Sequence, residues 1–208
     1  ILNSDFTANS IYVGKGYTLN ISKTGSLVTN AKSLVYGNIN LESDHDAFAS
    51  FIMNNSLVTD EDSSNEGSIT YSRYIAPSPV NDLISPILGG QTPQSVTSAN
   101  SNIYNNGTLA AFGSYNATNK SYDLFNLSDS TTSLSVSKGY ILARTAGSAD
   151  KYVEFTGTPN RYDRTVVTTQ GGWQLVGNPY TAYIKVSDFI TANSGSLDAS
   201  YQFVYGYN

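Results

Sequence analysis

The chain has 208 residues, of which only 13% are charged, and its formal net charge of −5 comes without a cluster of Lys or Arg. Nucleic acid is therefore excluded as a partner, because binding to phosphates needs a concentrated basic surface. The absence of cysteine excludes disulfides, thiolate metal sites and cysteine nucleophiles, and no apolar run reaches the roughly 20 residues of a membrane-spanning helix.

The composition favours strands and turns over long helices, because the chain contains 16 Tyr and many Ser, Thr and Asn residues. In the first part of the chain, short apolar pairs recur with Gly or Asn between them. This spacing is typical of the stacked rungs of a small β-solenoid or of a tight meander, and both alternatives stay open. The pairs are Ile11/Val13, Leu19/Ile21, Leu27/Val28, Leu34/Val35 and Ile39/Leu41.

The middle of the chain predicts further short strands. Residues 42–67 form a polar segment with one strand around Phe51, between exposed loops. Residues 91–107 are poor in apolar side chains, so we expect a long surface loop there. The other expected elements are strands at 68–75, 139–144, 152–157 and 166–167, an edge segment at 82–86, and a hairpin formed by 109–116 and 122–127.

The segment from Gly171 to Tyr180 carries the densest turn signals and the single tryptophan. Two glycines suit a tight hairpin, and the apolar Trp173 and Leu175 alternate around Gln174 as in a strand with one buried face. Pro179 ends that strand because it has no N–H to donate. We therefore predict that Trp173 lies buried between two sheets. The predicted fold is all-β: an antiparallel, jelly-roll-like β-sandwich at residues 44–208, preceded by a short solenoid or meander at residues 1–43.

The last part of the chain predicts a short helical turn and a final strand. Ser187 is a suitable cap for a turn through residues 188–190. Alternate aromatic residues then line one face of a strand, which we expect to be an open edge of a truncated domain. Such an edge pairs readily with other chains, either the remainder of the same polypeptide or the secretion machinery. The aromatic residues are Tyr201, Phe203, Tyr205 and Tyr207.

One segment resembles a known group of proteins. The run Gly172-Trp173-x-Leu175-Val176-Gly177-Asn178-Pro179-Tyr180, with Ile184 and Asp188-Phe189 after it, is similar to a segment of large secreted surface proteins of gliding Bacteroidetes. Those proteins are exported by the type IX secretion system. The resemblance implies a secreted location at the cell surface, outside the outer membrane, and a role in adhesion or gliding motility.

Other stretches extend the resemblance, with two departures. Asn81-Asp82 replaces an aromatic residue, and Tyr122 occupies the position where the group has Trp. Asp129-Ser130-Thr131 resembles the short O-glycosylation motif of these bacteria. The similar stretches are Tyr71-x-Arg73-Tyr74, Leu83-Ile84-Ser85-Pro86, Gly89-Gly90-Gln91-Thr92 and the hairpin around Tyr115-Asn116.

Catalytic and metal chemistry has little support in the sequence. His45 is the only histidine, so a two-histidine metal site is excluded, and we interpret Asp44-His45-Asp46 as a solvated turn. No residue is assigned as catalytic and no cofactor is expected. Asp60, Asp62 and Glu66 offer the oxygen ligands that Ca²⁺ prefers, but their spacing is not that of an EF-hand, and an acidic loop without metal is the alternative.

Aromatic residues are the remaining candidates for binding. Tyr104, Tyr115 and Tyr122 fall in or near predicted loops, where their rings could contact surface glycans. The sequence therefore predicts a non-catalytic domain of a secreted cell-surface protein that acts as an adhesion, stalk or structural module. The alternatives are a carbohydrate-binding module and an accessory domain of a larger secreted enzyme.

Overall fold

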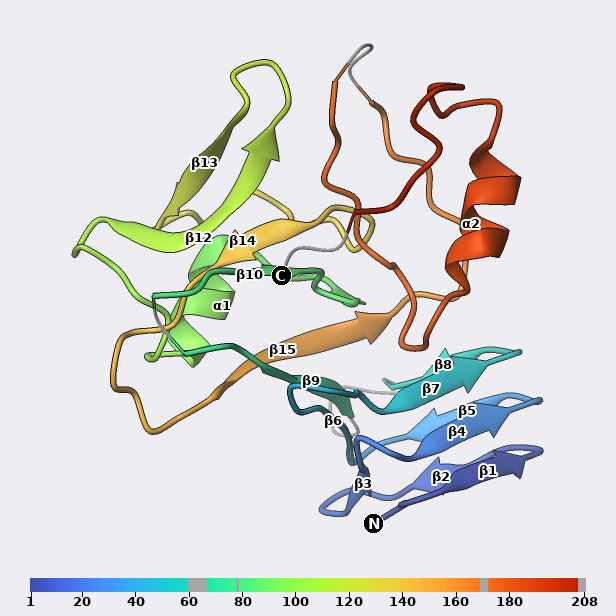
Figure 1. The fold of residues 1–208 in the computed structure, drawn as a ribbon. Coiled ribbons are helices and arrows are strands. Elements are labelled where there is room, and N and C mark those ends of the chain that lie inside the picture. Colours follow the sequence, from blue (N-terminus) through green and yellow to red (C-terminus); the bar gives the residue numbers. More distant parts are fainter. Residues whose placement is uncertain (60–66, 78, 169–171, 206–208) are drawn as a thin grey trace.

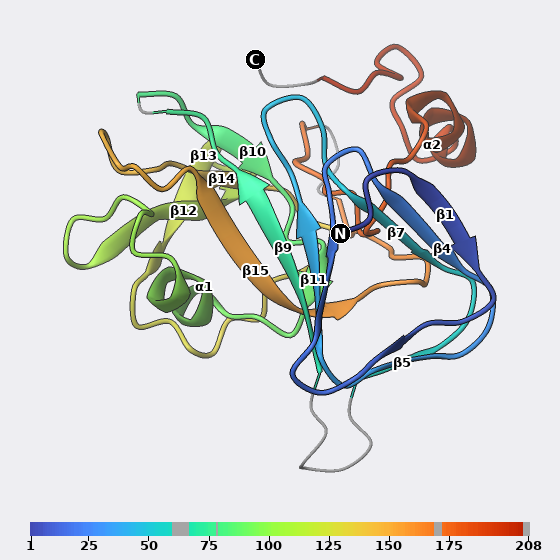
Figure 2. The same cartoon turned by 90° about the horizontal axis from the view of Figure 1, so that it is seen from below.

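The first part of the molecule is a parallel β-solenoid (Figure 1). The computed structural model describes residues 1–59, 67–77, 79–168 and 172–205. Within them, the chain makes three turns, here called rungs, of three strands each, and Figure 2 looks along the stack. The rungs are β1 (Asp5–Ala8), β2 (Tyr12–Val13) and β3 (Thr18–Ile21); β4 (Ser26–Thr29), β5 (Ser33–Val35) and β6 (Asn38–Glu42); and β7 (Ser50–Met53), β8 (Leu57–Val58) and β9 (Ser68–Tyr74).

Strand pairing distinguishes the solenoid from a meander, because every strand pairs in parallel with its equivalent in the next rung. The three ladders are β1-β4-β7, β2-β5-β8 and β3-β6-β9. A meander would instead pair consecutive strands antiparallel. The stack also continues past residue 43, the boundary expected from the sequence, because β7 and β9 extend two of the ladders.

In-register stacking places the apolar side chains of successive rungs on top of one another. Leu19, Ile39 and Ile69 occupy one ladder position, and the last two are fully buried. The corners between strands have no room for side chains. A Cβ on Gly37 would lie 2.2 Å from the carbonyl oxygen of Tyr17, so only glycine fits there.

β9 links the solenoid to the second half of the chain. It pairs in parallel with β6 on one edge and antiparallel with β15 (Tyr152–Pro159) on the other. β15 also pairs with β11 (Leu88–Gly89), so the order of this five-stranded sheet is β11-β15-β9-β6-β3. One continuous sheet therefore runs from the solenoid into the second half.

A second sheet completes the sandwich and has the order β10-β14-β12-β13. Phe112 and Leu142 from this sheet belong to the same buried cluster as Val153 and Phe155 from the first sheet. The all-β sandwich class is confirmed, as are the predicted edge segment and the hairpin. The strands are β10 (Asp82–Ile84), β14 (Tyr140–Leu142), β12 (Leu109–Asn116) and β13 (Ser121–Asn126).

A helix lies where the sequence predicted a long surface loop. Helix α1 (Pro93–Ala99) begins with a capping box between Thr92 and Ser95 and buries Val96. Asn100 then pairs with the backbone of Glu154 in β15, accepting from its N–H (2.7 Å) and donating to its carbonyl oxygen (2.9 Å). The prediction was wrong because one buried apolar residue of the helix, Val96, and the polar side chain of Asn100 together fix this segment to the sheet.

The prediction of a buried strand at Trp173 was also wrong. Trp173 is 58% exposed, and Val176 forms only an isolated bridge with Lys138. Leu175 packs closely over Gly139: a Cβ added to Gly139 would lie 2.6 Å from the Cγ of Leu175. The segment therefore bonds to residues 137–139, just before β14, without adding a full strand to the sandwich.

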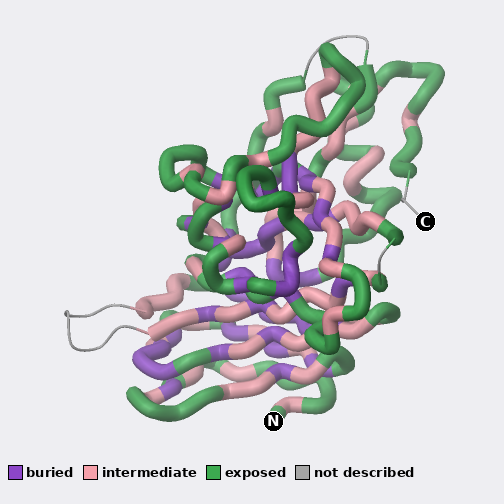
Figure 3. Tube along the Cα trace, turned by 90° about the vertical axis from the view of Figure 1, so that its left-hand side faces the viewer, coloured by how far each residue is buried: buried purple, intermediate pink, exposed green. Residues whose placement is uncertain are grey.

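The remaining C-terminal predictions are mixed. Helix α2 (Val186–Asn193) lies where a helical turn was expected, but Lys185 is its N-terminal cap residue and Ser187 is not. Neither residues 166–167 nor residues 201–205 form a strand. Figure 3 shows the contrast: buried residues follow the solenoid and the sandwich, whereas the C-terminal part is mostly exposed.

Candidate functional site

Two of the three candidate tyrosines lie together in the structure. Tyr115 and Tyr122 face each other across the β12–β13 hairpin, with ring centroids 5.5 Å apart in an edge-to-face arrangement. Tyr104 lies at the other end of β12, where its carbonyl oxygen accepts a hydrogen bond from Ala111. The Tyr115–Tyr122 pair has the geometry of a cross-strand contact that stabilises a hairpin.

The predicted Ca²⁺ ligands Asp60, Asp62 and Glu66 lie outside the described residues.

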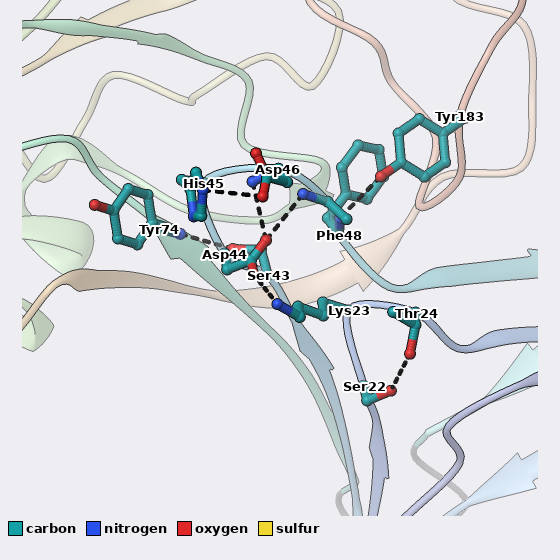
Figure 4. Close-up of polar contacts among 11 residues, drawn as sticks. Ser22, Lys23, Thr24, Ser43, Asp44, His45, Asp46, Phe48, Tyr74 and Tyr183 are labelled. Atoms are coloured by element: carbon teal, nitrogen blue, oxygen red, sulfur yellow. Dashed lines mark hydrogen bonds and ion pairs between the residues drawn. The ribbon is translucent and has the colours of Figure 1, made fainter.

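The Asp44-His45-Asp46 turn is closed by hydrogen bonds and an ion pair (Figure 4). One oxygen of Asp44 accepts the N–H groups of Asp46 (2.9 Å) and Ala47 (3.0 Å), and the other pairs with Lys23. The hydrogen bond from Lys23 is the main cause that lowers the pKa of Asp44 to about 2, and the backbone N–H groups add to it. The potential ligand atoms of Asp44, His45 and Asp46 lie within 4.8 Å of one another. The Lys23 ammonium group already pairs with Asp44, one of the two carboxylates of this turn.

The C-terminal segment is fastened to the third rung. Thr181 accepts the N–H of Phe51 in β7 (2.6 Å), and its hydroxyl donates to the carbonyl oxygen of Phe51 (2.5 Å). Tyr183 stacks on Phe48 with ring centroids 3.9 Å apart, and its hydroxyl accepts the N–H of Phe48 (2.8 Å) (Figure 4). These contacts cover the outer edge of β7.

Trp173, which the sequence placed in the core, belongs to an exposed aromatic cluster instead. The cluster consists of Trp173, Tyr201, Phe203 and Tyr205, each 58–65% exposed. Trp173 lies edge-to-face with Tyr205, with a centroid distance of 4.9 Å, and near Tyr201 at 6.5 Å. The signal for this cluster is present in the sequence as alternating aromatics after the single Trp, but the alternation was interpreted as a buried strand at Trp173 and a separate open edge strand after Tyr201.

A comparison with known protein families matches nearly the whole chain to a single domain family. A family model described as a domain of unknown function, DUF8693, matches residues 2–207. The chain belongs to the DUF8693 family. The match covers the solenoid, the sandwich and the C-terminal segment together, so the DUF8693 domain combines all three. No curated protein and no solved structure matches the chain.

Proposed function

We propose that this DUF8693 domain is a non-catalytic structural module of a secreted cell-surface protein, exported by the type IX secretion system, that acts as a stalk or adhesion module. The structural role rests on one observation: the sheet β11-β15-β9-β6-β3 runs from the solenoid into the sandwich. The proposed route of secretion rests on the resemblance of residues 172–180 to exported surface proteins. Neither described helix is long and apolar enough to cross a membrane.

The shared sheet suits a rigid spacer. β9 pairs with β15 over six residues and with β6 over five, so bending the joint would break hydrogen bonds on either edge of β9. Thr181 adds a second attachment at β7, on a different side of the solenoid. A module that holds its two ends at a fixed geometry can space or present neighbouring domains on a cell surface.

Hydrogen exchange tests the structural role. A solenoid variant such as Gly37→Ala should lower the protection of amides in β15 as much as that of amides in β6, because one cooperative unit unfolds as a whole. If β15 keeps its full protection while β6 loses it, the two halves are independent units and the rigid-spacer role is wrong.

The proposed location is tested separately. An epitope tag on the parent protein should be cleaved by protease added to intact cells, and it should stay inside cells that lack type IX secretion. A tag that is protected in both strains would contradict the proposal.

A carbohydrate-binding module is the second candidate, and the exposed aromatic cluster around Trp173 favours it. Exposed aromatic faces can stack on sugars. Under this alternative, glycans should change the fluorescence of Trp173, and Tyr201→Ala should weaken their binding. Tyr122→Ala, on the hairpin, is the control that separates this cluster from the tyrosines predicted by sequence. Unchanged fluorescence across a glycan array would exclude the alternative for the sugars tested.

A further inference from the structure

The two ends of the solenoid are covered differently. At the third rung, β15 pairs with the outer edge of β9, and Thr181 bonds to the outer edge of β7. At the first rung, β1, β2 and β3 are each the last strand of their sheet. Strand edges carry backbone N–H and C=O groups that point along the stack toward a further strand. We call the first-rung end the open end; it is lined by residues 1–2, 6, 11–14, 17–19 and 27.

The interior of the solenoid is exposed at the open end. A hollow of about 660 Å³ lies there, with walls that include Phe6, Tyr12, Leu19 and Leu27. Phe6 is in register with Leu27 and Phe51 in the next two rungs, yet Phe6 is 53% exposed and the other two are 1% exposed. The same ladder position is therefore buried in the two rungs whose outer side another segment covers, the first rung over Leu27 and the C-terminal segment over Phe51.

One residue already occupies the position of a further rung. Leu2 forms a parallel bridge with Ile21, donating its N–H to the carbonyl oxygen of Asn20 (2.8 Å) and accepting from Ser22 (2.9 Å). Ile21 is in turn the ladder partner of Leu41, so Leu2 continues that ladder by one step. Gly25 makes room for this contact, since a Cβ there would lie 2.4 Å from the carbonyl oxygen of Leu2.

We propose that the open end is the docking surface for one more parallel β-rung, supplied by the polypeptide that leads into Leu2. The inference deepens the structural role proposed above and rests on it. The third strand of such a rung is expected to carry two apolar residues two positions apart that point inward. Leu19 and Ile21 in β3, and Ile39 and Leu41 in β6, have this spacing. The added rung covers the hollow over Phe6 and pairs with β1 and β2.

A second copy of the chain fits the open end less well. Two identical ends that meet around a two-fold axis would pair their strands antiparallel, whereas the solenoid ladders are parallel. In both copies, Leu2 would also lie on the edge of β3 and separate the two β3 strands.

The test compares three purified proteins. The first is the 208-residue chain. The second carries its natural upstream polypeptide, about 40 residues or two rung lengths. The third calibrates the readout: a copy of residues 22–40 precedes Leu2 directly, so that Leu2 takes the place of Leu41 in the repeat.

We expect both extensions to slow hydrogen exchange at the β1 and β2 amides by at least about 10-fold and to raise the melting temperature by about 5 °C. Phe6→Asp should have little effect in the 208-residue chain, where Phe6 is half exposed, and a large one in both extended proteins. A scrambled copy of residues 22–40 is the control and should add no protection.

Two results would overturn the proposal. In one, the natural extension gives no protection although the copied rung does, so the occupant is not the upstream polypeptide. In the other, the 208-residue chain forms a dimer that Phe6→Asp disrupts, so the occupant is a second copy. Both readouts use purified protein, so a failure here is separate from a failure of the protease test of cell-surface location.

Discussion

The solenoid and the C-terminal region, residues 160–205, are both rich in apolar residues and turn formers, yet they bury them very differently. Ile21 and Ile39 in the solenoid are fully buried, whereas Trp173 and Phe203 are each more than half exposed. The solenoid residues lie on strands with ladder partners above or below, whereas Trp173 and Phe203 lie on no strand. Burial in this domain thus follows strand pairing across the chain more closely than the local apolar pattern.

The largest expected effect is the loss of a buried aromatic side chain, which we compare with the loss of an exposed one. Phe155→Ala should cost about 3–5 kcal/mol of unfolding free energy, because Phe155 is fully buried between the sheets. Trp173→Ala should cost less than about 1 kcal/mol, because most of that ring already contacts solvent. Urea denaturation followed by circular dichroism measures both. A similar cost for the two variants would show that the burial of the ring does not decide its contribution to stability.

The second prediction concerns the corners of the solenoid. Gly37→Ala should cost about 1–3 kcal/mol, since the new Cβ would overlap two carbonyl oxygens of the neighbouring rung, those of Gly14 and Tyr17. Gly195→Ala in the C-terminal region is the matched control, because no atom lies within 4 Å of the position that its new methyl group would take. The control should stay within about 0.5 kcal/mol of the parent. Equal effects would mean that rung spacing does not depend on glycine.

The third prediction tests where the two regions are joined. Thr181→Val should cost about 1 kcal/mol, because it removes the hydroxyl that donates to the carbonyl oxygen of Phe51. The Phe51 amide, which donates to Thr181, should exchange faster with solvent. Thr191→Val on the exposed face of α2 is the control and should leave Phe51 unchanged. Unchanged exchange in Thr181→Val would show that this hydroxyl does not hold the segment in place.

The smallest expected effect is a pH dependence at the edge of the solenoid. Folding lowers the pKa of Asp44 from 3.8 to about 2, so its ionised form stabilises the fold above about pH 4. That contribution is lost as the pH falls from about 4 to about 2. Asp44→Asn keeps an oxygen for the N–H groups of Asp46 and Ala47 but has no charge to pair with Lys23.

The melting temperatures of the parent and of Asp44→Asn should therefore differ at neutral pH and converge near pH 2. Salt should reduce the difference, because Lys23 and Asp44 interact near the surface. A constant difference over the whole pH range would argue against the ion pair.

The fold class and many of the strands can be predicted from the amino-acid sequence. Residue types with strand preference, separated by Gly and Asn turns, predicted the β12–β13 hairpin and the edge strand β10, and the structure contains both. These elements depend on alternation and turn chemistry within a few residues, which sequence alone can reveal. For the candidate site, sequence also singled out Tyr115 and Tyr122, which are cross-strand neighbours in the hairpin.

How those strands pair, and which apolar faces are covered, depends on contacts between distant parts of the chain. A strand such as β4 has partners about 20 residues away on either side, and its own residues do not specify whether they run parallel or antiparallel. Trp173 shows the same limit, since alternation indicates an apolar face but not the element that covers it. Helix α1 was missed because Asn100 binds the backbone of β15, a contact across 54 residues of sequence. Hydrogen bonds and burial between distant segments therefore fixed the solenoid and the helix, and the lack of a covering element among the described residues left the aromatic cluster around Trp173 exposed.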